Sequence, residues 1–118
     1  DILPEIYPLL TTLVGHPKFG NEATAVANTE LNRRTVDDGK VTDHHALLIT
    51  ENYPKELSND ERIIYDSIAG RMIEAIGKPC IKQTTTICAV CGETAYQTTG
   101  SVVKSAGWRK VFNETEIC

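Results

Sequence analysis

Leu57-Ser58-Asn59-Asp60-Glu61 opens the stretch that decides the fold of this chain. Ser58 predicts a helix N-cap, because its hydroxyl can accept from the Glu61 amide while the Glu61 carboxylate reaches back to the Ser58 amide. Apolar residues then follow at four-residue spacing, which predicts one buried face made of Ile64, Ile68, Met72 and Ile76. Gly77 and Pro79 predict the end of this helix.

Shorter helical segments are predicted upstream. Residues 1–16 read as helical, and Pro8 suits the first turn of a new helix, so we expect a short helix to end just before it and a second to follow. Residues 22–27 can form another short helix, ended by Asn28. His16 follows the stop of its helix, so we expect it to be a solvated end residue.

Downstream of Cys80 the apolar spacing changes from helical to alternating, which predicts strands. A hairpin and two shorter strand pieces are expected in this order: residues 83–90, a turn at Cys91-Gly92, residues 94–99, 102–103 and 110–112. Gly100 interrupts the pattern. The predicted fold class is therefore α+β, with a mainly helical part over residues 1–80 and a strand segment over residues 81–118.

The bulk composition bounds the function. The chain has 118 residues and a formal net charge of -4, so no overall positive field draws it to nucleic acid. Any DNA contact must come from a local patch. No apolar run approaches the roughly 20 residues of a membrane span, and no signal peptide is present, so we expect a cytoplasmic protein. The chain begins at Asp1 without a methionine, and we expect an excised piece of a longer protein.

Four cysteines include one Cys-x-x-Cys, at Cys88 and Cys91. A structural zinc site usually pairs two such motifs, or one with two histidines. Here Cys88 and Cys91 fall inside strand-like sequence, so we expect plain buried thiols and no metal site. A zinc-stabilised interaction domain using Cys80, Cys88 and Cys91 is the alternative.

Two adjacent histidines stand out in Val41-Thr42-Asp43-His44-His45-Ala46-Leu47-Leu48-Ile49-Thr50. Polar sequence precedes them and an apolar run follows, which is typical of a loop that presents polar groups and then enters a core. Imidazole can donate to a phosphate and titrates near neutral pH. The functional interpretation is a site at His44 and His45. The alternative is two polar residues at the mouth of a buried strand.

The polar segment 29–43 carries the other candidate residues, Arg33, Arg34 and Lys40. Its acidic residues nearly cancel these charges, so a solvated loop is one interpretation. The functional interpretation is that the basic side chains project to a phosphate while the acids face elsewhere.

The stretch from His44 to Thr50 also resembles the His-x-Ala-Ile-x-Pro-Thr motif of type IA DNA topoisomerases, closest to bacterial DNA topoisomerase III. The similarity continues through residues 57–65, Arg71-Met72 and residues 107–112, in the family's order and spacing. Ile49 stands where the family usually has Pro. The acid usually found two residues before the histidine is here Thr42, with Asp43 adjacent.

This resemblance implies that residues 1–80 are the rest of the tyrosine-bearing domain III and that residues 81–118 are strands of the hinge domain II. It implies that His44 supports catalysis by contacting the phosphate backbone of single-stranded DNA near the cleavage site. Arg33 and Arg34 match a basic stretch upstream of that histidine, and with Lys40 and His45 they would bind DNA.

The resemblance also implies what the chain lacks. The family cleaves one DNA strand through a phosphotyrosine, and Tyr7-Pro8 lacks the Arg-Thr that follows the family's tyrosine. Its magnesium lies in a toprim domain, so we expect no cofactor here. The parent would be an enzyme whose other segments are this piece's partners, whereas the piece alone would be inactive. A stand-alone DNA-binding module remains an alternative.

Overall fold

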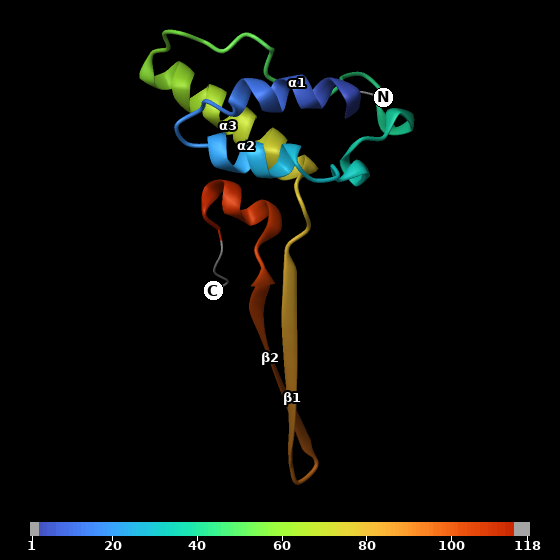
Figure 1. Cartoon of the computed structure of the whole chain (residues 1–118). Helices are drawn as coiled ribbons and strands as arrows, with labels where there is room; N and C mark the ends of the chain where they lie inside the picture. The colour runs from blue at the N-terminus through green and yellow to red at the C-terminus, as the bar shows by residue number, and fades with distance from the viewer. Residues whose placement is uncertain (1–2, 115–118) are drawn as a thin grey trace.

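The computed structural model describes residues 3–114 and shows a helical body with one long projecting arm (Figure 1). The body contains α1 (Leu3–Leu13), α2 (Gly20–Ala27), α3 (Asn59–Ile76) and three short 3-10 helices: η1 (Arg33–Thr35), η2 (Asp38–Lys40) and η3 (Gly107–Phe112). The arm is an antiparallel hairpin of β1 (Ile81–Cys91) and β2 (Thr94–Ser105). The α+β class is confirmed, and the molecule measures 67 × 34 × 28 Å.

The capping box of α3 forms as predicted. The Glu61 amide donates to the Ser58 hydroxyl over 3.2 Å, and the Ser58 amide donates to the Glu61 carboxylate over 3.1 Å. The helix's inner face is made of Ala69, Met72, Ile73 and Ile76. The prediction that Ile64 belongs to this face is wrong, because that side chain is 61% exposed. Four residues turn a helix by about 400°, so a four-residue stripe drifts around it by roughly 40° per step.

The prediction that Pro8 starts a new helix is wrong. It lies inside α1, which runs unbroken from Leu3 to Leu13. Proline cannot donate to the carbonyl four residues earlier, but α1 buries Ile6, Leu9, Leu10 and Leu13, and this packing maintains the helix. The short helix over residues 22–27 is confirmed as α2, and Asn28 caps its C-terminus.

One hydrophobic core joins the three α-helices. Phe19, just before α2, is its largest fully buried side chain. Its T-shaped contact with Phe112 of η3 has ring centroids 5.5 Å apart. The core consists of Ile6, Leu9, Leu10, Leu13, Phe19, Ala23, Leu31, Ile49, Ala69, Met72, Ile73, Ile76 and Val111.

The predicted hairpin is confirmed and is longer than expected. Gly92, with φ of 62°, and Glu93 form the two-residue connection, and a positive φ suits glycine there. The expected interruption at Gly100 does not occur, because Gly100 pairs with Thr85 and β2 continues to Ser105. The side chains of β1 are exposed on both faces of the ribbon, as are nearly all of those of β2.

The strand expected at residues 110–112 is wrong, because the chain forms η3 there and returns to the helical body. Gly107 has φ of 55° and lies so close to the Pro79 carbonyl that a side chain would not fit. The Trp108 amide donates to the Lys78 carbonyl over 2.9 Å. These contacts close the root of the hairpin and place Val111 in the core.

Candidate nucleic-acid interface

The loop that carries His44 and His45 is exposed, and it is anchored at its downstream end. The Nδ1 atom of His45 lies 3.0 Å from the Ala46 carbonyl, to which it donates, so Nε2 is left for other partners. Ile49 is buried in the core. The expected apolar run from Ala46 to Ile49 is an extended loop and not a strand, and only its end enters the core.

Contacts to α1 hold the same loop further along. Thr12 Oγ1 lies 3.0 Å from the Glu51 carbonyl and bridges α1 to the segment after Ile49. The histidines therefore sit on a short exposed span between the turn η2 and the core residue Ile49. An imidazole placed this way can donate to an anion in solvent without disturbing the fold.

Lys40 belongs to η2, upstream of the histidines. Its Nζ lies 3.8 Å from Asp37 Oδ2, and the lysine side chain is 86% exposed. A pair this exposed is worth about 0–1 kcal/mol, so the ammonium can exchange Asp37 for a phosphate at little cost. Asp37 also accepts from the Gly39 amide over 3.0 Å, which sets the turn predicted at Asp38-Gly39.

Arg33 and Arg34 lie on η1, which is tied to the C-terminal end of α3. The Asn32 amide donates to the Ile76 carbonyl over 2.9 Å, and the Thr35 hydroxyl lies 3.0 Å from the Ala75 carbonyl. Both arginines are exposed. They line a groove of about 340 Å³ together with Lys78, a residue that no sequence pattern singles out.

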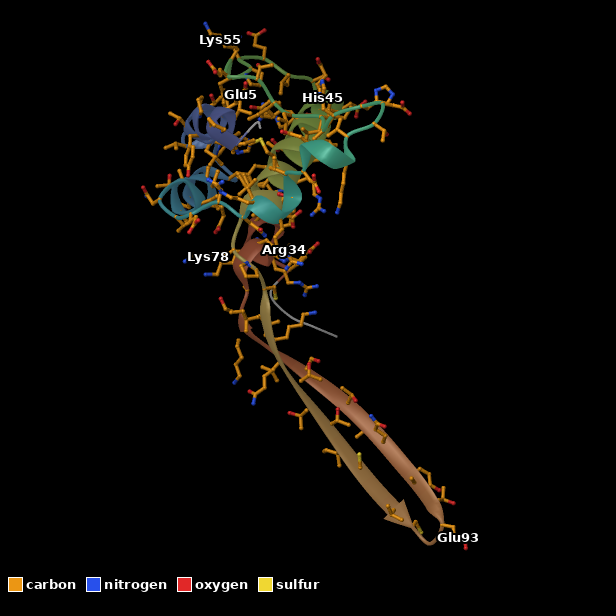
Figure 2. All side chains as sticks on the ribbon, turned by 90° about the vertical axis from the view of Figure 1, so that its right-hand side faces the viewer. Glu5, Arg34, His45, Lys55, Lys78 and Glu93 are labelled. Carbon is orange, nitrogen blue, oxygen red and sulfur yellow. The ribbon has the colours of Figure 1, made fainter. Side chains whose placement is uncertain are left out.

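The five candidate residues do not form one cluster. Figure 2 shows His45 near the far end of the helical body and Arg34 beside Lys78, where the hairpin begins. Between these two places lies an apolar hollow of about 400 Å³, bordered by Val36, Leu47, Leu48 and Met72. The candidate interface therefore has two parts: a histidine loop (His44, His45, Lys40) and a basic groove (Arg33, Arg34, Lys78).

His16 contradicts its expected role as a solvated residue, because it is only 4% exposed. Its Nε2 lies 2.7 Å from Asp66 Oδ1, and its Nδ1 accepts from the amides of Lys18 and Phe19. Its ring stacks on Phe19. Asp66 is 50 positions away in the sequence, so no local pattern could have revealed the pair. This histidine fixes the turn between α1 and α2.

The expectation of buried thiols is wrong for Cys88 and Cys91, which are exposed on β1, while Cys80 is partly buried. Cys88 and Cys91 are three positions apart on a strand, so they project to opposite faces. A strand rises about 3.3 Å per residue, which puts Cys80 more than roughly 20 Å from Cys88. These three thiols cannot share one zinc ion in this fold, because zinc–sulfur bonds are about 2.3 Å long. No helix within residues 3–114 is long and apolar enough to cross a membrane.

A family model described as DNA topoisomerase matches residues 4–117. The chain therefore belongs to the DNA topoisomerase family, and the resemblance found in the sequence is confirmed.

Among its relatives, the DNA topoisomerase 3 of Bacillus licheniformis is 31% identical over 116 residues, which is 96% of this chain and 16% of that protein. The DNA topoisomerase 1 of Alkalihalophilus pseudofirmus is 33% identical over 89% of this chain and 16% of the relative. The DNA topoisomerase 3 of Bacillus subtilis is 35% identical over 69% of this chain and 11% of the relative. The chain thus spans about one-sixth or less of the length of these relatives.

Proposed function

We propose that this chain is part of a type IA DNA topoisomerase of the bacterial cytoplasm and contacts the backbone of single-stranded DNA near the cleavage site. The observation that carries the proposal is the family match over residues 4–117, which includes the histidine loop. The exposure of His44 and His45 is compatible with this role. Net charge supplies no general attraction, so the contact depends on these local groups.

His44 is the residue proposed to support cleavage. An imidazole N–H aimed at a non-bridging phosphate oxygen would stabilise the charge that develops there as the strand is cut. Arg33, Arg34, Lys40 and His45 would hold the backbone in position without reading the base sequence. By the resemblance the nucleophile is a tyrosine, so the part of these side chains in the reaction is binding, orientation and charge stabilisation.

We also propose that this chain cleaves no DNA on its own. By the resemblance, the tyrosine nucleophile precedes the region matched here and the magnesium-binding toprim domain comes earlier still. We expect no covalent DNA adduct when the purified chain is incubated with an oligonucleotide and denatured. An adduct on Tyr7, Tyr53, Tyr65 or Tyr96 would contradict this expectation.

The decisive experiment compares His44→Ala and His45→Ala in the parent enzyme. Cleavage of a single-stranded oligonucleotide should slow by about ten- to a thousandfold for His44→Ala, the range for losing one positioned donor. His45→Ala should have a smaller effect, which makes it the matched control. Melting curves of both variants should stay close to the wild type, because both side chains lie on an exposed loop. Wild-type cleavage by His44→Ala, or a loss fully explained by unfolding, would remove His44 from the proposed site.

The two alternatives gain no specific support. A zinc-stabilised domain needs cysteines that the hairpin holds apart. A stand-alone DNA-binding module does not explain why the family match extends along the whole described chain.

A further inference from the structure

The root of the hairpin carries two adjoining grooves. The first, of about 340 Å³, is lined by Arg33, Arg34 and Lys78. The second, of about 270 Å³, is lined by Lys78, Trp108 and Lys110. Gly77 and Lys78 border both, so the grooves meet at the junction between α3 and the hairpin. We call these two adjoining grooves together the root groove.

The charge of the root groove is opposite to that of the whole chain. Its two parts are lined by four basic side chains and two acidic ones, Glu30 and Glu22, in a chain whose formal net charge is -4. Ion pairs among residues 3–114 include His16–Asp66, Lys40–Asp37 and Arg71–Glu74. None of these three pairs involves a cation of the root groove, and the four basic side chains outnumber the two acidic ones there, which leaves an excess of positive charge at one place.

The aromatic residue of the groove is fixed in position. Trp108 is partly buried, its amide donates to the Lys78 carbonyl over 2.9 Å, and the Arg109 guanidinium lies 5.3 Å from its ring centroid. η3 is docked on α3 through Val111 and Phe112, so the ring is presented by a packed element. A held indole beside lysines and arginines is the arrangement that proteins use to bind unpaired strands, because bases stack on the ring while cations track the phosphates.

We propose that the root groove binds a single-stranded nucleic-acid segment, with Lys78 and Lys110 on phosphates and Trp108 against a base. This rests on the proposed function, since the ligand is the same class of DNA. It adds Lys78, Trp108 and Lys110 to the binding surface and places a second contact at the opposite end of the body from His45 (Figure 2). The strand held there leaves the histidine loop free to act on another part of the DNA.

Two signals measured in one titration test the inference. The anisotropy of a labelled oligodeoxythymidine reports binding anywhere on this chain. The fluorescence of Trp108, the single tryptophan of the sequence, reports occupancy of the root groove. We expect both signals to change with the same midpoint, and the tryptophan emission to be quenched. A duplex of the same length should quench it much less.

The test variant is a double substitution, Lys78→Gln together with Lys110→Gln. The control is Lys55→Gln. Lys55 is an exposed lysine at the far end of the body, so its substitution matches the charge change of one groove lysine without touching the groove (Figure 2). Each lost phosphate contact should lower the slope of log affinity against log salt by about 0.7. The double variant should therefore lose roughly 1.4 from the slope, and Lys55→Gln should change it little. Circular dichroism melting checks that each variant is folded.

The outcomes separate the two proposals. Anisotropy binding without tryptophan quenching, or a double variant that behaves like Lys55→Gln, overturns the root groove while DNA binding by the chain stands. Equal quenching by duplex overturns the preference for a single strand. No anisotropy change with the wild-type chain overturns the proposed function, and the root groove with it.

Discussion

At the scale of the residue, His16 is fixed by three hydrogen bonds. Its Nδ1 accepts from two backbone amides, those of Lys18 and Phe19, so the ring proton is on Nε2 and is donated to Asp66. The ring is also packed against Phe19 and lies 6.4 Å, centroid to centroid, from Tyr65. One side chain thus joins α1, the turn before α2, and the middle of α3.

His16→Ala should destabilise the chain by roughly 3–5 kcal/mol, because it leaves two amides without their acceptor and opens a cavity. Asp66→Asn is the matched control, since the amide oxygen can still accept from Nε2. It should cost less than about 1 kcal/mol. Urea unfolding followed by circular dichroism measures both. Equal losses for the two variants would mean that the contact with Asp66, and not the amide cap, carries the stabilisation.

Glu74 shows the opposite situation, a carboxyl that the fold does not favour in its charged form. Burial raises the pKa of Glu74 above its ordinary value, and nearby Glu114 adds to this, while Arg71 at 3.5 Å partly offsets it. As pH rises, the unfolded chain loses this proton first. The folded chain keeps it to higher pH, so stability falls through that window.

Glu74→Gln should therefore raise the melting temperature at pH 7, and the gain should shrink toward zero near pH 4, where the wild-type carboxyl is protonated. The pair with Arg71 is a weak opposing effect, since the arginine side chain is 72% exposed. Thermal melts at several pH values check the sign. A variant less stable than wild type at pH 7 would show that the ion pair outweighs burial.

At the scale of the element, the contact between α3 and η3 depends on one glycine. A Cβ on Gly70 would overlap Cζ of Phe112, so the ring occupies the space of the missing side chain. The same ring packs edge-on against Phe19. Phe112 therefore cannot move away from α3 without disturbing the core.

Gly70→Ala should destabilise the chain, because overlap in a packed site costs about 1–3 kcal/mol, whereas alanine gains about 1 kcal/mol in helix propensity. Gly15→Ala is the matched control, since nothing lies within 4 Å of a Cβ built there. It should stay within about 0.5 kcal/mol of wild type. Chemical denaturation gives the free energy of unfolding of both variants. A Gly70→Ala variant more stable than wild type would show that the Phe112 ring moves aside easily.

Elements were predictable where their signals are local. The capping box at Ser58 and the alternation around the hairpin turn are short-range patterns, and both gave the right element. Residues 110–112 were misassigned to a strand because three apolar-rich residues have no period of their own. The docking of η3 depends on two glycines. Gly70 lies on α3, far from η3 in the sequence, and Gly107 needs a positive φ.

The candidate site was less predictable than the fold. His44 and His45 were found because the motif is contiguous, and the arginines because they are adjacent. Lys78 joins Arg33 and Arg34 only after α3 brings residues more than 40 positions apart into one groove. The burial of His16 also depends on tertiary structure, because its partner Asp66 lies on α3, 50 positions further along the chain. Tertiary juxtaposition of this kind leaves no local pattern in a single sequence.

At the scale of the whole molecule, the helical body and the arm differ in what holds them. None of the core residues lies in β1 or β2. Large apolar side chains on the hairpin, including Ile87 at 60% and Val90 at 74% exposure, remain in solvent. A two-stranded ribbon is only marginally stable on its own. We expect its amides to exchange with deuterium much faster than those at residues 69–76 of α3, where the core lies.

Shortening the hairpin tests this division directly. Joining Thr84 to its partner Ser101 through an Asn-Gly turn removes the outer arm and keeps a register pair whose hydroxyls lie 3.2 Å apart. The melting temperature should change little, because every core residue and the docking of η3 are retained. Trp108 emission should also keep its native maximum, since that residue lies outside the deleted segment.

A longer deletion supplies the control for that prediction. Removing residues 81–112 also takes away η3, and with it Val111 and Phe112, which contact α3 and Phe19. This variant should lose cooperative thermal unfolding, while the shortened hairpin keeps it. If the shortened variant also unfolded without cooperativity, the outer arm would be contributing to the core through interactions beyond those of its exposed side chains, and the body would not be an independent folding unit.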